Sequence, residues 1–426
     1  MFKQKILDNQ EKIKNISLIK RDIEFNSEIL WLNKIISFVG PRRAWKTYFM
    51  YQVAKDLIGN WKLNYEEIVF LDFSEILQKK IDFDKILENF LEIYPDKKPF
   101  FIFDEVQDIE NFREWIIWLF NKWYKIFISW SNAKLLSQEI STEFRWRNFE
   151  IFILPLSFKE FVKFKNWEFS EKIETKNFYS TQENALIKNL FLEFLKYWAY
   201  PEIALIDNIQ LKEWIIKDYF NLLVYKDLKE RYKIDNDFAL KYLVSEISKN
   251  TWEEFSINKI YTNLKSQWIK IWKDTLYNYL IYLENIFFSK RILNFYSPKG
   301  ASKNYLFDLS FWNVFSQNNE NCEKKFENAV FLELLRKNNS NLSNNSIYFK
   351  KILTREISFF DEINNCDIQV EFKLEEKSKK LDKIIKNLKK SSEENLKINK
   401  KIIYFDKNFE NLDNKIFIDF KKFFLN

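Results

Sequence analysis

Residues 35–58 join an apolar run, a short loop and a helical stretch, and this order constrains the fold more than any other feature of the chain. The run from Ile35 to Val39 has the length and composition of a buried strand. The loop GPRRAWKT follows it from Gly40 to Thr47 and leads into a helical stretch that reaches residue 58. A strand that reaches a helix through such a loop is typical of phosphate-binding loops.

In such a loop, backbone amides wrap phosphates at the start of the helix. Lys46 would contact the β- and γ-phosphates of ATP, and the Thr47 hydroxyl would bind Mg2+. Trp45 stands where the pattern requires glycine, and its indole would project into the space that phosphates occupy. The alternative is a chance match, against which the strand and the helix argue. The predicted cofactor-binding residues are Gly40, Pro41, Arg42, Arg43, Ala44, Trp45, Lys46, Thr47 and Tyr48.

A second motif, Phe-Phe-Ile-Phe-Asp-Glu, ends an apolar strand at residues 100–105. Asp104 would support the Mg2+ ion and Glu105 would polarise the attacking water, as in P-loop hydrolases. An ordinary strand end is the alternative. The position of the strand after a phosphate-binding loop favours the catalytic interpretation.

Polar residues follow the next predicted strand, which covers residues 124–129. Asn132 or Ser131 would sense the γ-phosphate there, and a plain turn or helix cap is the alternative. Arg145 and Arg147 would act as arginine fingers, in cis or from a neighbouring subunit, unless they form an ordinary basic turn.

Strands and helices alternate between residues 35 and 154, which predicts an α/β fold with a parallel sheet covered on both faces. The pattern is helical from residue 157 to 231, a small helical unit follows to about residue 288, and short strands and helices return after Lys299. A solvated helix is predicted from Glu375 to Lys401. The predicted domains are an ATPase domain with an N-terminal extension (1–165), a helical lid (166–231), a winged-helix-like unit (232–290) and a second α/β domain (291–426).

The chain resembles the large family of prokaryotic AAA+ ATPases that carry a C-terminal restriction-endonuclease-like domain of unknown function. The resemblance implies a P-loop AAA+ sheet, ATP and Mg2+ as ligands, and ATP hydrolysis as the activity. It leaves the process that hydrolysis drives unassigned. The matching segments are GPRRAWKT (40–47), FDEVQ (103–107), ISWSNAKLLS (128–137), EFRWR (143–147), LPLSFKEF (154–161), YWAYPEI (197–203) and SQWIK (266–270).

Tryptophan replaces glycine at several positions of these segments. The chain has three glycines and fifteen tryptophans, whereas ordinary usage predicts about 30 glycines. We infer that the codon UGA, which some bacteria read as glycine, was translated as tryptophan. Genuine UGG codons would contradict this, and the alternative is a degenerate P-loop that no longer binds ATP. Relatives typically carry glycine at the positions of Trp45, Trp130, Trp146, Trp198 and Trp268, whereas Trp115 reads as a genuine tryptophan.

The C-terminal domain carries only part of a nuclease-like site. Glu327 and Glu356 are present, but Ser358 stands where relatives often have aspartate. The segment Gln369-Val370-Glu371 lacks the lysine of a Glu-x-Lys motif, so nuclease activity is not expected. In the winged-helix-like unit, structural packing is the alternative to DNA phosphate contacts by Lys265, Lys270, Lys273 and Tyr277.

Composition excludes several other classes. The chain has no histidine, which removes Ser-His triads and histidine-ligated metals. Its net charge of +7 permits a DNA partner without requiring one. Its two cysteines and the lack of a long apolar run predict a cytoplasmic protein without a membrane partner. A homo-oligomer or another protein partner stays open, and a non-catalytic nucleotide-binding or DNA-associated scaffold is the competing function.

Overall fold

A computed structural model describes the chain except for residues 1, 24, 26–27, 30–31, 62, 77–80, 132–143, 145–146, 175, 177, 198–199, 316–320, 339–345, 354, 376–377, 391–397, 408–415 and 426. The chain forms two compact units, which comprise residues 1–154 and 155–426. The finer division predicted for residues 166–426 stays a prediction.

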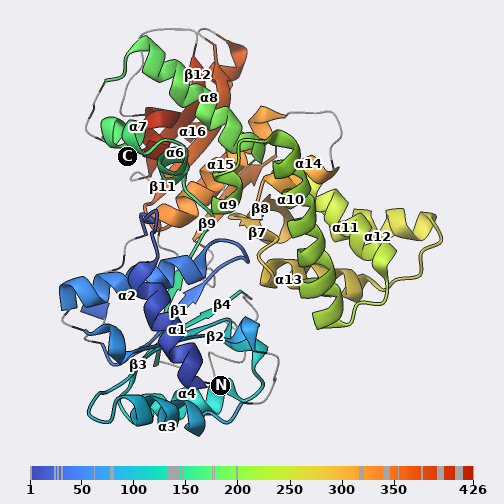
Figure 1. The fold of residues 1–426 in the computed structure, drawn as a ribbon. Helices are drawn as coiled ribbons and strands as arrows, with labels where there is room; N and C mark the ends of the chain where they lie inside the picture. The colour runs from blue at the N-terminus through green and yellow to red at the C-terminus, as the bar shows by residue number, and fades with distance from the viewer. Residues whose placement is uncertain are drawn as a thin grey trace. The chain divides into compact units, whose positions relative to one another are not determined.

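The first unit contains five parallel strands in the order β2-β3-β4-β1-β5, with helices packed against them (Figure 1). This arrangement confirms the predicted α/β fold with a parallel sheet. Its described elements are α1 (Phe2–Asn15), β1 (Ile35–Val39), α2 (Lys46–Trp61), η2 (Tyr65–Glu67), β2 (Ile68–Asp72), η3 (Phe73–Glu75), α3 (Asp84–Ile93), β3 (Phe100–Asp104), η4 (Val106–Asp108), α4 (Phe112–Asn121), β4 (Lys125–Trp130) and β5 (Asn148–Phe152).

Both faces of this sheet are packed, because alternate side chains of its apolar strands point to opposite sides. In β3, Phe100 and Ile102 belong to a buried cluster that includes the apolar residues of α2. Phe101 and Phe103 instead contact the ring of Trp115 in α4, at centroid distances of 5.7 and 5.1 Å. Trp115 is buried beside these two rings, and its assignment as a genuine tryptophan stays a prediction.

The second unit has a mixed eight-stranded sheet in the order β13-β12-β11-β10-β9-β7-β8-β6. Its described elements are α6 (Phe158–Lys165), α7 (Trp167–Glu174), α8 (Thr181–Tyr197), α9 (Pro201–Ala204), α10 (Ile209–Leu222), the π-helical η7 (Leu223–Glu230), α11 (Asp237–Lys249), β6 (Glu254–Phe255), α12 (Ile257–Ser266), α13 (Lys273–Asn285), β7 (Ser289–Asn294), β8 (Ser297–Leu306), α14 (Ser310–Phe315), α15 (Cys322–Lys337), β9 (Ile347–Ile352), β10 (Arg355–Asp361), β11 (Cys366–Leu374), α16 (Lys379–Lys390), β12 (Asn399–Lys407), β13 (Phe417–Asp419) and α17 (Phe420–Leu425).

The helix predicted from Glu375 to Lys401 is wrong at its C-terminal end. The described helix α16 ends at Lys390, and the strand β12 begins at Asn399. The segment after Lys401 is rich in β-branched and aromatic residues, which favour strands. It pairs in parallel with β11, which buries Ile402 and Ile403. The first residues of β12 include Lys400 and Lys401, which continue the charged composition of α16, so the sequence pattern predicted one longer helix.

Several tryptophans occupy the left-handed backbone region, which bulky residues rarely adopt. Trp45 (φ 59°) and Trp268 (φ 61°) are two of the positions predicted to require glycine. Trp123 (φ 64°) and Trp252 (φ 75°) share this conformation, although the sequence did not single them out. Trp130 differs, because it is fully buried at the end of β4 and its Nε1 has no hydrogen-bond partner among the described residues.

Candidate functional site

The loop after β1 packs closely against the chain that follows β5. A Cβ atom on Gly40 would lie 2.1 Å from the carbonyl oxygen of Ile153, so only glycine fits there. Further along the loop, Arg43 and Trp45 both have left-handed φ angles. Glycine at position 45 would relieve this local strain.

Trp45 precedes the first residue of α2, and its backbone oxygen accepts a hydrogen bond from the amide of Phe49. Its ring stacks on Tyr48, with the centroids 4.4 Å apart and an interplanar angle of 23°. The two aromatic rings therefore lie at the helix end where amide groups of a phosphate-binding loop face the ligand.

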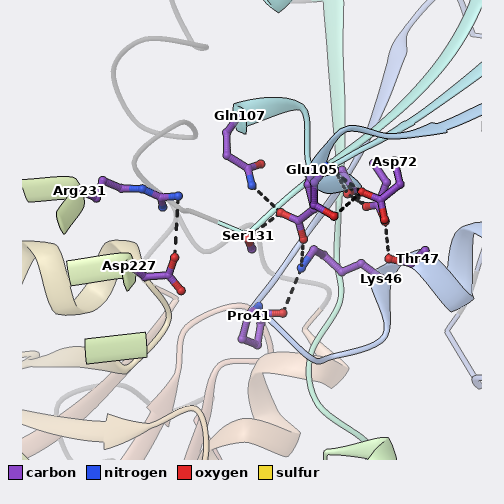
Figure 2. Close-up of polar contacts among 12 residues, drawn as sticks. Pro41, Lys46, Thr47, Asp72, Glu105, Gln107, Ser131, Asp227 and Arg231 are labelled. Atoms are coloured by element: carbon purple, nitrogen blue, oxygen red, sulfur yellow. Dashed lines mark hydrogen bonds and ion pairs between the residues drawn. The ribbon is translucent and has the colours of Figure 1, made fainter. Parts of the chain in front are cut away.

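Lys46 is the first residue of α2, and its side chain is only 3% exposed. Its ammonium donates a hydrogen bond to the Pro41 carbonyl oxygen at 3.1 Å and lies 3.5 Å from Oε1 of Glu105 (Figure 2). The lysine therefore spans the loop and points toward the end of β3. A phosphate group in the loop would compete with both contacts for this charge.

Asp104 ends β3 and is fully buried. It accepts hydrogen bonds from the hydroxyls of Thr47 and Ser129, one on each carboxylate oxygen. Burial and the nearby carboxylates of Glu105 and Asp72 raise the pKa of Asp104 to about 7, although both hydroxyls oppose the rise. A cation at this position would favour the charged carboxylate.

Glu105 follows with a left-handed φ of 51°, so its side chain leaves the strand in a new direction. Its Oε2 accepts hydrogen bonds from the Gln107 amide at 2.5 Å and from the Ser131 hydroxyl at 2.8 Å (Figure 2). Burial alone would raise its pKa, but the charges of Lys46 and Arg42 and these hydrogen bonds outweigh burial and lower it. Glu105 is therefore a fixed, charged carboxylate at neutral pH.

Three members of the site were missed by sequence reasoning. Asp72 lies opposite Asp104 in the strand register, and its pKa is raised by burial. Ser129 contacts Asp104, and Gln107 contacts Glu105. Two weak signals were available, because Asp72 and Ser129 come at or near the ends of parallel strands, whose carboxyl ends share one edge.

The other predicted residues lie in different places. Ser131 reaches Glu105, whereas Asn132 and Arg145 lie outside the described residues. Arg147 immediately precedes β5, which runs parallel to β1 and begins at the same level of the sheet. The P-loop follows the carboxyl end of β1, so Arg147 lies at the opposite edge, where the strands begin. Its guanidinium lies 5.9 Å from the Phe120 ring centroid.

The nuclease-like residues of the second unit also meet, around a cavity of about 230 Å³. The cavity is lined by residues that include Glu327, Glu356, Ser358, Gln369 and Glu371. In the described part of the chain, no group of three or more acidic or cysteine side chains is placed to hold a metal ion.

Lysines neutralise the acids around this cavity. Lys303 lies 2.5 Å from Glu356 and 3.9 Å from Glu327, and its side chain is 5% exposed. Lys380 lies 2.6 Å from Glu371. An ammonium group therefore lies between two of the carboxylates that a metal-dependent nuclease would use for its cation.

Comparisons with known proteins agree with the first unit. A family model described as an AAA domain matches residues 32–162. The chain is 35% identical over 433 residues to the uncharacterized protein MJ1544 of Methanocaldococcus jannaschii, covering 99% of this chain and 92% of that protein. It is 28% identical over 372 residues to an uncharacterized protein of Haemophilus influenzae, covering 83% of this chain and 85% of that protein.

Similarity to solved structures is low. The Aeropyrum pernix ORC1 protein in complex with DNA gives a TM-score of 0.30 at 9% identity, over 74% of this chain and 91% of that chain. The C. elegans PCH-2 structure gives a TM-score of 0.25 at 14% identity, over 54% of this chain and 62% of that chain. Among the described helices, none is long and apolar enough to span a membrane.

Proposed function

Because the chain belongs to the family of the Methanocaldococcus jannaschii protein and carries an AAA domain, we propose that it binds ATP with Mg2+ and hydrolyses it. The observation that carries this proposal is the meeting of Lys46, Thr47, Asp104 and Glu105 at the carboxyl edge of one parallel sheet. These side chains match the lysine, hydroxyl and acid set that phosphoryl transfer requires.

The donor set suits a magnesium ion and a triphosphate. Thr47 and Asp104 would hold Mg2+, and the Gly40 backbone and Lys46 would hold the phosphates. When bound, Mg2+ supplies charge neutralisation for the phosphate oxygens. Trp45 is the exception, since the motif requires glycine at this position and an indole there would compete with the phosphates for space.

Glu105 would orient the attacking water, with its carboxylate held by Gln107 and Ser131. In the structure, the charge of Lys46 helps to lower the pKa of this carboxyl and makes it a weak proton acceptor. A ligand that draws Lys46 to the phosphates would remove that charge from Glu105. Its pKa would then rise, and with it the basicity of the carboxylate toward water.

The tryptophan conformations support the decoding proposal. We infer that positions 45, 123, 252 and 268 carry glycine in the functional protein, because each has a left-handed φ. Positions 130, 146 and 198 belong to the proposal on sequence grounds, and residues 146 and 198 lie outside the described part. If tryptophan at position 45 is genuine, the protein is instead a scaffold that does not hydrolyse ATP.

The element order α11-β6-α12-α13-β7-β8 supports a winged-helix-like unit that contacts DNA. β6 and β7 both pair with β8 in antiparallel fashion, as the wing of such a unit requires. Lys265, Lys270 and Tyr277 are exposed near the turn between α12 and α13, and Lys273 is half-buried at the start of α13. These four side chains would contact phosphates of the DNA backbone.

A homo-oligomer would explain the position of Arg147. At the sheet edge opposite the P-loop, Arg147 would serve the ATP site of a neighbouring copy instead of its own. Size-exclusion chromatography with ATP, compared between Trp45→Gly and Trp45→Gly/Arg147→Ala, would test whether ATP drives association through this residue.

The test of the proposed activity is Mg2+-dependent phosphate release by the chain with glycine at position 45. We expect turnover in Trp45→Gly and its loss in Trp45→Gly/Lys46→Ala. Phosphate release that does not depend on Lys46 would overturn the proposal.

A further inference from the structure

Helix α16 concentrates positive charge on one short segment of the second unit. Its 12 residues include six lysines and one aspartate, which gives the helix a net charge of +5. The whole chain has a net charge of +7, so all other residues together contribute +2. A charge excess confined to one helix creates a local field that attracts a partner of opposite charge.

One face of α16 is buried against the sheet of the second unit (Figure 1). Ile384 and Leu388 are 7% and 3% exposed, and Leu381 packs against the same apolar cluster. This cluster includes residues of β10, β11 and β12, so three neighbouring strands anchor the helix. The apolar face of α16 is therefore already covered within the chain.

The opposite face of α16 carries a lysine stripe, formed by Lys379, Lys383 and Lys386. All three are exposed, and their spacing of four and three residues aligns them along one side of the helix. None of them forms an ion pair with a described carboxylate, whereas Lys380, at the border of the stripe, pairs with Glu371. At a rise of 1.5 Å per residue, the stripe is about 10 Å long.

The charge and length of the lysine stripe suit the phosphate backbone of DNA. Each strand of a duplex carries one phosphate per 3.4 Å of helix axis, so about 10 Å corresponds to three phosphates. Lysine ammonium groups bind phosphate oxygens as flexible point charges, and such contacts hold the backbone without reading bases.

An anionic membrane surface is the other partner with a high density of negative charge. Amphipathic helices bind such surfaces by inserting an exposed apolar face between the lipid headgroups. The apolar face of α16 packs on β10, β11 and β12 instead, which leaves the lysines without the insertion that membrane binding uses. The structure therefore favours DNA.

We propose that the lysine stripe of α16 binds the phosphate backbone of DNA without sequence preference. This surface is distinct from the contacts proposed for the winged-helix-like unit. That unit contributes β6, β7 and β8 to one end of the eight-stranded sheet, whereas α16 packs on β10, β11 and β12 in the other half. The proposal also does not depend on ATP, because the P-loop belongs to the first unit.

The probe is a short fluorescein-labelled DNA duplex of mixed sequence, titrated with the full chain by fluorescence anisotropy at several salt concentrations. The test variant is Lys379→Gln/Lys383→Gln/Lys386→Gln, in which glutamine keeps the helix propensity of lysine. Each phosphate contact contributes about 0.9 to the slope of log affinity against log salt concentration. We therefore expect the slope to lose about 2 to 3 units and Kd to rise at least tenfold at low salt.

The matched control is Lys14→Gln/Lys217→Gln/Lys226→Gln, which removes three exposed lysines outside α16 and the winged-helix-like unit. It changes the net charge equally, so it should keep the slope of the parent chain. Equal losses in both triple variants, an unchanged slope in the α16 variant, or no salt-dependent binding by the parent chain would overturn the proposal. Melting curves of both variants would verify that they fold.

Two further arms separate this surface from the alternatives. Lys265→Gln/Lys270→Gln/Lys273→Gln tests the winged-helix-like unit, and duplex binding that depends on these lysines but not on the stripe would overturn the present proposal alone. Vesicles of phosphatidylserine and phosphatidylcholine test the membrane. Vesicle binding that the α16 variant loses, while its duplex binding stays unchanged, would assign the stripe to lipid and overturn the proposal.

Discussion

The Thr47 hydroxyl donates a hydrogen bond to the Asp104 carboxylate, which joins the first turn of α2 to the end of β3. The second oxygen of Asp104 accepts from Ser129 in the neighbouring strand. The two residues proposed to hold Mg2+ are therefore in direct hydrogen-bond contact. The part of the site that departs from the expected pattern is the phosphate loop, where Trp45 has a left-handed φ and its ring stacks on Tyr48.

Trp45→Gly should restore nucleotide binding. Glycine adopts a φ of 59° without strain and opens the space that phosphates require. We expect ATP affinity to rise by at least tenfold, measured with a fluorescent ATP analogue and competition by ATP. Trp123→Gly is the matched control, because it has the same backbone conformation away from the loop. An equal gain in both variants, or in neither, would contradict the assignment.

Glu105→Gln, made in the Trp45→Gly chain, should abolish turnover and keep ATP binding. The amide preserves size but cannot accept a proton from water, so we expect a loss of about 10²- to 10⁴-fold in kcat. Phosphate release and ATP binding would be measured on the same preparation. Glu110→Gln, an exposed acid five residues later, is the control. Turnover that survives in Glu105→Gln would remove this residue from the mechanism.

Asp104 should make stability depend on pH. Its pKa is about 7 in the folded chain against an ordinary value of 3.8, so the folded chain binds more protons between these values. The free energy of unfolding should therefore fall as pH rises through this interval. In Asp104→Asn, the free energy of unfolding should lack the part of its pH dependence that comes from this carboxyl group. Urea denaturation of the parent chain and of Asp104→Asn across this pH interval measures the difference. If the free energy of unfolding depends on pH in the same way in both proteins, the pKa of Asp104 is not raised.

Trp268→Gly and Trp123→Gly should each stabilise the fold by about 1 kcal/mol, because an L-residue with a left-handed φ costs about that much. Both side chains are exposed, so little packing is lost. Trp214→Gly lies inside α10 and should destabilise by about 1 kcal/mol. Urea denaturation would compare the three variants. Equal destabilisation by all three substitutions would contradict the assignment of glycine to positions 123 and 268.

Lys303→Met should lower the free energy of unfolding by about 2 kcal/mol, because Glu327 would lose its buried cationic neighbour. The contact with Glu356 contributes less, since that carboxylate is 43% exposed. Lys303→Met/Glu327→Gln should recover part of the loss. Lys299→Met, an exposed lysine nearby in the sequence, is the control. Thermal or urea unfolding would measure all four proteins, and a Lys303→Met protein as stable as its parent would show that this lysine is not needed.

Part of the site could be predicted because its signals are local. Gly40, Lys46 and Thr47 stand at fixed spacing in one loop, and Asp104 and Glu105 end one apolar strand. Parallel strands bring their carboxyl ends to a common edge, so chain order alone predicted that the two motifs would meet. Position 45 was recognised as abnormal for the same local reason.

The remaining contacts depend on packing between distant segments. Strand register and helix packing bring Lys46 to Glu105 and the Ser129 hydroxyl to Asp104. They also place Lys303 between Glu327 and Glu356. The left-handed conformations of Trp123 and Trp252 likewise appear only in the folded backbone.

The sequence by itself thus determined the chemistry available, since residue types and their spacing along one strand, loop and helix are local properties. The tertiary structure decided which charges neutralise one another and where cavities form. Hydrogen bonds and ion pairs act over a few ångströms, and only the folded chain sets such distances between residues far apart in sequence.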